Sequence, residues 1–225
     1  MTNEWKNIAG EATKIQGTKN QVLNPVVLDL VKSFAKGKTL FDYGCGWGEF
    51  ADTMQKEGFV VTAFDDADEM VTQAKGKFQK PTFLYKKDFY EKLTEMMGGF
   101  DVITSNLVLC ILEKEQQAVM LGNIKSLVKD DGVIVISFCH PKYDYLPNSL
   151  VSTRVSPVGA KYSDEFVYEK EIKENGVKFH DFHRPLEYYL DLFKKQGLEI
   201  LEMKESDTLD TAYSPDFIIF ALKKH

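Results

Sequence analysis

Residues 39–48 read T-L-F-D-Y-G-C-G-W-G, and the other segments of the chain can be placed around them. A short apolar run, Leu40 and Phe41, leads into Asp42, and glycine then fills positions 44, 46 and 48. Glycine permits positive φ angles and lets a ligand approach the backbone closely. The residues that follow, 49–54, suit a helix, whose N-terminus offers free N–H donors. The segment therefore predicts a strand, a tight turn and a helix that hold a nucleotide or a polar molecule of similar size.

The spacing of these glycines distinguishes between ligands. A dinucleotide-binding turn has the pattern G-x-G-x-x-G, which would require a third glycine where Glu49 stands. An acidic side chain is a poor neighbour for a pyrophosphate, whereas Asp42 is a good neighbour for a cation. The turn therefore favours a ligand that carries a positive group, and the alternative is a glycine turn that binds nothing.

Apolar runs recur along the first two thirds of the chain and alternate with helical patterns. The runs at 59–64, 82–85, 100–105 and 133–138 predict buried strands. Between the last two, residues 114–128 form a helical pattern with Val119 and Ile124 directed to the core, and residues 130–132 form a turn. This alternation predicts an α/β fold with a doubly wound parallel sheet, which binds ligands at the carboxyl ends of its strands.

An acidic pair follows the second of these strands. Asp65 and Asp66 come about 20 residues after the glycine turn, which is the spacing of an acid that accepts hydrogen bonds from a ribose diol. Asp65 is therefore the candidate ribose ligand.

The segment from Asp42 to Gly48 closely resembles the first motif of class I S-adenosylmethionine (SAM) methyltransferases, D-x-G-x-G-x-G. The resemblance extends over nearly the whole chain. It implies a Rossmann-like, seven-stranded, mostly parallel sheet whose last strand is antiparallel and lies between the fifth and sixth. It also implies SAM as cofactor and S-adenosylhomocysteine as product.

The same resemblance assigns roles by position. Asp65 falls on the ribose ligand, Asp88 and Phe89 on the residues at the adenine, and Asn106-Leu107 on the segment beside the methionine part. Asp88 has an alternative role as a helix cap. The residues expected to contact the cofactor are Asp42, Gly44, Cys45, Gly46, Gly48, Asp65, Asp66, Met70, Asp88, Phe89, Asn106, Leu107 and Val108.

We expect one domain, residues 1–225, with two additions to the sheet. Residues 1–23 form an N-terminal arm, in which Trp5 either anchors the arm to the surface or belongs to a lid. Residues 140–184 form an antiparallel flap inserted after the fifth strand. After the flap, a helix over 183–193 and strands over 198–203 and 216–222 complete the fold.

The flap contains a hairpin signal. Strands over 165–172 and 177–183 flank Asn175-Gly176, which predicts a two-residue type I′ turn that places Ile172 opposite Phe179. One face of the hairpin then carries Phe166, Tyr168, Ile172, Phe179 and His183. Such a flap is a common place for substrate specificity.

Three histidines are candidate general bases: His140, and His180 and His183 in or beside the flap. A hydroxyl acceptor can require a base, and histidine is the usual one. We favour His183, beside the expected cofactor methyl group, and then His140, at the end of the fifth strand. The alternative is that these histidines are packed side chains. Arg184 either recognises an acidic group of the acceptor or pairs with a surface acid.

Composition excludes several partners. The formal net charge of −6 argues against a nucleic acid substrate, and no apolar run is long enough to span a membrane. Three distant cysteines without metal-ligand spacing favour a reducing, cytoplasmic setting. Metal-assisted members of the resembling fold cluster Asp and Asn after strands four and five, where this chain has 104–106 (T-S-N) and 137–139 (S-F-C), so we expect no metal.

The sequence thus predicts an enzyme that transfers a methyl group from SAM to an oxygen or nitrogen of a small-molecule acceptor, as a monomer or homodimer. Methyl transfer is expected to depend mainly on alignment and desolvation. Two alternatives stay open: a nicotinamide-dependent Rossmann oxidoreductase, and a non-catalytic SAM-binding module.

Overall fold

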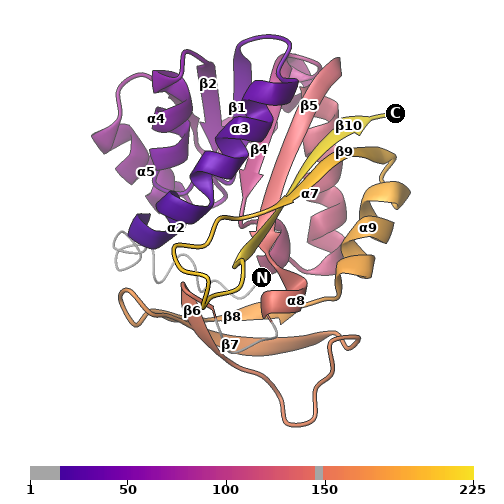
Figure 1. Cartoon of the computed structure of the whole chain (residues 1–225). Coiled ribbons are helices and arrows are strands. Elements are labelled where there is room, and N and C mark those ends of the chain that lie inside the picture. Colours follow the sequence, from indigo (N-terminus) through magenta and orange to yellow (C-terminus); the bar gives the residue numbers. More distant parts are fainter. Residues whose placement is uncertain (1–15, 145–148) are drawn as a thin grey trace.

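The computed structural model describes residues 16–144 and 149–225, which form a seven-stranded sheet with helices on both faces and a separate three-stranded sheet (Figure 1). The strand order of the large sheet is β3-β2-β1-β4-β5-β10-β9. Its strands, in chain order, are β1 (Thr39–Tyr43), β2 (Val60–Phe64), β3 (Thr82–Leu84), β4 (Phe100–Asn106), β5 (Val128–Cys139), β9 (Leu198–Glu205) and β10 (Phe217–Lys224).

Strand directions confirm the predicted topology. β1, β2, β3, β4 and β5 pair in parallel, while β10 pairs antiparallel with both β5 and β9. The last strand therefore lies between the fifth and the sixth of the large sheet and runs against them. Because the carboxyl ends of the parallel strands lie at one edge, this edge can hold a ligand.

Helices connect the strands and cover both faces of the sheet, with α3 in front and α7 behind in Figure 1. α3 shows why these segments are helical: its buried residues, Val26, Val27, Leu30 and Val31, recur at helical spacing after a proline in the first turn. The helices are α2 (Gln16–Val22), α3 (Asn24–Phe34), α4 (Glu49–Lys56), α5 (Asp68–Lys77), α6 (Lys86–Met96), the 3₁₀ helix η2 (Leu109–Ile111), α7 (Lys114–Leu127), α8 (Pro141–Asp144) and α9 (Leu186–Lys195).

The prediction of a turn at residues 130–132 was wrong. These residues lie within β5, which begins directly after α7. They form an irregularity in the pairing of β5 with β4. Phe100 pairs with Val128 but Val102 pairs with Val133, so the register shifts between these two pairs. Lys129 reaches back to Asp101 with an Nζ–Oδ1 distance of 2.7 Å, which holds the irregular segment against β4.

The small sheet is the predicted flap, and it has one strand more than the sequence indicated. It contains β6 (Ser152–Val155), β7 (Phe166–Ile172) and β8 (Lys178–His183). The four-residue β6 had no alternating apolar pattern that could have predicted it. The flap lies beside the end of the large sheet where β5 runs into α8 (Figure 1).

The hairpin between β7 and β8 differs from its prediction in register. Ile172 faces Val177, whose carbonyl accepts its N–H at 2.9 Å, and Lys170 pairs with Phe179. Residues 173–176 link the strands in place of a two-residue turn, because Gly176 adopts φ +72° and donates to the Ile172 carbonyl. The register differs by two residues, an even number, so the same side chains share a face as predicted. That face also carries Lys170 and Asp181, both buried.

Two further details of the flap region correct the sequence reading. The helix predicted over 183–193 begins only at Leu186, because His183 ends β8 and Pro185 is the N-cap. The flap is fastened to the large sheet by Asp216, which accepts the Leu150 N–H at 3.0 Å and lies 3.8 Å from the guanidinium of Arg154.

No helix in the described part of the chain is long and apolar enough to cross a membrane. The expected arm over 1–23 is described only from residue 16, as α2 and the N-cap residue Leu23 of α3, so Trp5 lies outside the described residues. Its role, the single-domain boundaries and the cytoplasmic setting stay predictions.

Candidate functional site

A cavity of about 470 Å³ lies at the carboxyl ends of β1, β2 and β4. Its walls come from the glycine turn, the start of α5, the segment after β4 and the first turns of α6 and α7. The lining residues are Lys19, Asp42, Tyr43, Gly44, Cys45, Gly46, Trp47, Glu49, Phe50, Phe64, Asp65, Asp66, Ala67, Met70, Lys86, Tyr90, Asn106, Leu107, Val108, Ile111, Leu112, Glu115, Gln116, Val119 and Met120.

The glycines of the turn have different tasks. All three adopt positive φ, between +53° and +80°. A Cβ on Gly44 would lie 2.3 Å from Val108, and one on Gly48 would lie 2.6 Å from the ring of Phe83, so these two glycines allow packing. A Cβ on Gly46 would meet nothing within 4 Å. Gly46 therefore provides the backbone conformation and the open approach that a ligand in the cavity needs.

Asp65 joins the glycine turn to the end of β2. Its Oδ2 accepts the Gly46 N–H at 2.8 Å, and its Oδ1 accepts the Ala67 N–H at 3.0 Å. Burial raises the pKa of Asp65 to about 6, although these two hydrogen bonds oppose the shift. A carboxylate held by two N–H groups keeps further lone pairs for hydroxyl groups of a ligand.

A second carboxylate, Asp42, lies deeper. It accepts a hydrogen bond from Thr104 Oγ1 at 2.8 Å, and burial raises its pKa to about 7. Lys19, from α2, lines the same cavity, and burial lowers the pKa of its ammonium against the opposing effect of Glu49 and Asp42. The cavity thus places negative and positive groups side by side, as a zwitterionic ligand would require.

The segment after β4 contributes an unusual backbone and a donor. Leu107 adopts φ +62°, which is strained for a residue with a Cβ. Asn106 accepts a hydrogen bond from Ser137 Oγ at 2.8 Å, but its buried Nδ2 has no partner within the structure. A buried donor without a partner is costly, so Asn106 Nδ2 is a candidate for binding a ligand in the cavity.

The structure brings together most of the residues that the sequence predicted for the cofactor. Those that line the cavity are Asp42, Gly44, Cys45, Gly46, Asp65, Asp66, Met70, Asn106, Leu107 and Val108. Gly48, Asp88 and Phe89 do not line it. Phe89 is fully buried and stacks on Phe64 with ring centroids 4.1 Å apart, which makes it a core residue.

The candidate bases also lie outside the lining. His183 is buried, stacks on Phe166 at 4.6 Å, and donates from Nε2 to the carbonyl of Tyr162 at 2.8 Å. His140 is buried as well, with Nε2 3.2 Å from Glu205 Oε1. Both therefore have the environment of packed side chains.

Arg184, the third polar candidate near the flap, is buried too. Its Nη2 donates to the Leu112 carbonyl at 2.9 Å. Since Leu112 lines the cavity, Arg184 contacts the backbone of a lining residue and does not line the cavity itself.

Several lining residues escaped the sequence reading. Lys86 and Tyr90 line the cavity where Asp88 and Phe89 were expected to act, because Phe89 is the buried residue of α6. The placement of Val119 in the core was wrong: it is 58% exposed at the cavity. A run of four apolar residues, 118–121, cannot all face one side of a helix, and this was the available signal.

Sequence comparison places this site in context. The model of the family described as "Methyltransferase domain" matches residues 16–203. The chain is 29% identical, over 83% of its length and 85% of the relative's, to a candidate methyltransferase of Geobacillus sp. (strain WCH70). It is 24% identical, over 89% of its length and 90% of the relative's, to the ubiquinone biosynthesis O-methyltransferase of Coxiella burnetii (strain Dugway 5J108-111).

Structural comparison gives a consistent result. The crystal structure of an S-adenosylmethionine-dependent methyltransferase from Mesorhizobium loti superposes with a TM-score of 0.64. The alignment has 19% sequence identity and covers 89% of this chain and 96% of that one. At this identity the likeness concerns the fold.

Proposed function

Because this chain belongs to the methyltransferase-domain family, we propose that it transfers a methyl group from SAM to an oxygen or nitrogen atom of a small-molecule acceptor. The observation that carries the proposal is the cavity at the strand ends, where Asp42, Asp65, Lys19 and the unpartnered Asn106 Nδ2 line one space. The Coxiella relative is named for O-methylation, which supports oxygen as the first acceptor atom to test.

The residues of the cavity fit SAM group by group. Asp65 would accept hydrogen bonds from the ribose hydroxyls, and Tyr90 and Met70 offer apolar surface to the adenine. Asp42 provides negative charge near the cationic amino group, and Lys19 provides positive charge for the carboxylate. Asn106 Nδ2 would gain a partner that residues 16–144 and 149–225 do not supply.

When bound, SAM supplies a methyl group already activated by a positively charged sulfur. The protein therefore has to align the acceptor with that methyl and exclude water. Gly46 lets the cofactor approach the turn, while the strained segment at Leu107 shapes the opposite wall.

The acceptor is proposed to bind beside η2 and α7. The wall there consists mainly of apolar side chains, with Glu115 and Gln116 as polar groups. These lining residues are Ile111, Leu112, Glu115, Gln116, Val119 and Met120. Such a surface suits a small acceptor with an apolar part and one methylated polar group.

Thermal unfolding in the presence of candidate ligands tests the proposal. SAM and S-adenosylhomocysteine should each raise the melting temperature, because they bind the native state only. NAD and NADP should leave it unchanged. A rise with a nicotinamide cofactor and none with SAM would instead favour the oxidoreductase alternative, whereas SAM binding without turnover on a broad set of acceptors would favour a non-catalytic module.

The role of His183 has its own test. A catalytic base at this position would make turnover fall in His183→Gln while SAM affinity stayed the same. From its burial and its stacking on Phe166, we expect the structural outcome: a lower melting temperature with unchanged turnover per folded molecule. A large loss of turnover, with normal stability and a changed pH profile, would restore His183 as the base.

A further inference from the structure

A second group of reactive side chains lies where the flap meets the end of β5. It consists of Cys110 on η2, Cys139 at the end of β5, Lys170 on β7 and Asp181 on β8. All four side chains are buried, and none of them lines the cavity. The proposed methyl transfer uses none of them.

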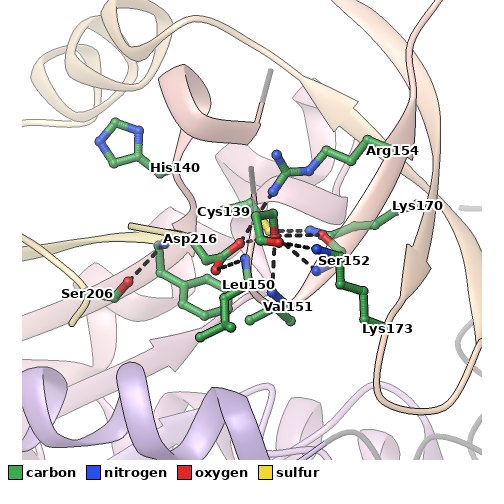
Figure 2. Close-up of polar contacts among 12 residues, drawn as sticks. Cys139, His140, Leu150, Val151, Ser152, Arg154, Lys170, Lys173, Ser206 and Asp216 are labelled. Atoms are coloured by element: carbon green, nitrogen blue, oxygen red, sulfur yellow. Dashed lines mark hydrogen bonds and ion pairs between the residues drawn. The ribbon is translucent and has the colours of Figure 1, made fainter. Parts of the chain in front are cut away.

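Lys170 and Cys139 are in direct contact. Lys170 Nζ lies 2.7 Å from Cys139 Sγ, and Figure 2 shows the lysine reaching across to this sulfur. Asp181 Oδ2 lies 3.4 Å from Lys170 Nζ and 3.8 Å from Cys139 Sγ. An amine, a thiol and a carboxylate are therefore in contact at a buried site. The thiol comes from β5 of the large sheet, and the amine and the carboxylate come from β7 and β8 of the flap.

The geometry disfavours a metal ion at this place. Cys110, Cys139 and Asp181 offer ligand atoms within 4.8 Å of one another, as a metal site would. However, the ammonium of Lys170 already contacts two of these three residues and supplies the positive charge. A divalent cation would have to displace that charge or lie against it.

A disulfide between Cys110 and Cys139 is the competing oxidation product, since their sulfur atoms lie within 4.8 Å of each other. The nucleophile in disulfide formation is a thiolate. A hydrogen bond with Cys139, together with burial, raises the pKa of Cys110 well above its ordinary value, which disfavours Cys110 as the attacking thiolate. Lys170 Nζ, at 2.7 Å from Cys139 Sγ, lies nearer to that sulfur than Asp181 Oδ2 does at 3.8 Å, so we take the lysine nitrogen as its reaction partner.

We propose that Lys170 and Cys139 become joined by a nitrogen–oxygen–sulfur bridge when the protein is exposed to dioxygen. One oxygen atom inserted between Nζ and Sγ bridges two atoms that are already in contact. The S–H bond and one N–H bond break, and an S–O and an O–N bond form.

The reaction balances with dioxygen as the oxidant. A thiol, an amine and one O₂ give the bridge and one water. Sulfur and nitrogen each lose two electrons, and the four electrons reduce O₂ to the bridging oxygen and the water oxygen. The proton that the ammonium must release first goes to the Asp181 carboxylate, its neighbour at 3.4 Å. Burial excludes bulky disulfides such as oxidised glutathione, but a small apolar oxidant can enter.

The bridge would fasten the flap covalently to the large sheet. Cys139 belongs to β5 and Lys170 to β7, so the bridge would link residues 139 and 170 and close the segment between them into a loop. Cross-linking restricts the unfolded chain, and the oxidised protein should therefore melt several degrees higher than the reduced one.

Intact-mass spectrometry of the unmodified protein tests the proposal. After incubation in air-saturated buffer, we expect a mass gain of one oxygen less two hydrogens, which a thiol reductant reverses. Peptide mapping should then show the segments that contain Cys139 and Lys170 linked to each other. Variants Cys139→Ser and Lys170→Arg should lose the mass change, while the matched control Cys110→Ser should keep it.

Three results would overturn the proposal. An unchanged mass would show that the pair does not react with dioxygen. A loss of two hydrogens alone, mapped to Cys110 and Cys139, would show a disulfide instead. A gain of whole oxygen atoms without a cross-link would show ordinary oxidation of a thiol. The wild-type measurement alone separates these outcomes, so the test stands even if a variant fails to fold.

Discussion

Replacing Asp65 by alanine is expected to weaken SAM binding by about 1.5–3 kcal/mol, which is roughly a 10- to 150-fold rise in Kd. The reason is a double loss. The variant lacks the acceptor proposed for the ribose hydroxyls. It also lacks the hydrogen bond from Gly46 at 2.8 Å, which holds the glycine turn to the end of β2, and the one from Ala67 at 3.0 Å, which orders the start of α5. Isothermal titration calorimetry with S-adenosylhomocysteine measures the effect without turnover.

Asp66 provides a matched control for this prediction. It is the neighbouring carboxylate, it lines the same cavity, and it pairs with Lys86 at 2.6 Å at a partly exposed position. Exposed ion pairs contribute little, so Asp66→Ala should cost less than about 1 kcal/mol of binding free energy. Equal losses for the two variants, or an unchanged affinity of Asp65→Ala with an intact fold, would refute the assignment of Asp65 to the ribose.

Replacing Asp42 by asparagine is expected to stabilise the protein at alkaline pH while weakening SAM binding. Burial raises the pKa of Asp42 from 3.8 to about 7. The folded state thus retains a proton on Asp42 that the unfolded state releases above about pH 4, and the contribution of Asp42 to stability falls as the pH rises from about 4 to 7. Asparagine has no such proton and can still accept the hydrogen bond from Thr104.

The size of this stabilisation follows from the shift in the pKa of Asp42 from 3.8 to about 7. The advantage of Asp42→Asn in the free energy of unfolding should grow by up to about 2.5 kcal/mol between pH 5 and pH 8. Urea denaturation at both pH values measures it.

Asp101→Asn is the control of opposite sign. Although burial raises the pKa of Asp101, hydrogen bonds from Lys129 and Thr39 outweigh it and lower the pKa to about 2. That variant should therefore lose stability at neutral pH. If the Asp42 variant shows no gain at pH 8, its carboxyl group is not the desolvated acid that the structure indicates.

The large sheet and the cofactor edge could be predicted because their signals are local. A buried strand followed by the glycine turn at 44–48 is compatible with few structures other than a ligand-binding strand–turn–helix unit. Asp65 then follows at a spacing set by the length of one helix and one strand. The hydrophobic pattern also fixed the shared face of the flap hairpin, even though its turn was predicted with the wrong length.

The remaining details depend on contacts between distant segments. Phe89 stacks on Phe64 in the core while Tyr90 lines the cavity, and this orientation of α6 depends on tertiary packing that the local sequence does not encode. Lys19 enters the site from α2, which carries no motif. Likewise, the burial of His183 reflects its stacking on Phe166, across the hairpin, and not its neighbours in sequence.

A crystal structure of the protein with S-adenosylhomocysteine tests the central claim most directly. The account predicts the ligand in the cavity between the glycine turn and the segment at Leu107, with ribose hydroxyls hydrogen-bonded to Asp65 and a ligand oxygen or nitrogen accepting from Asn106 Nδ2. A ligand bound elsewhere, or bound in this cavity with Asp65 turned away from the ribose, would contradict it.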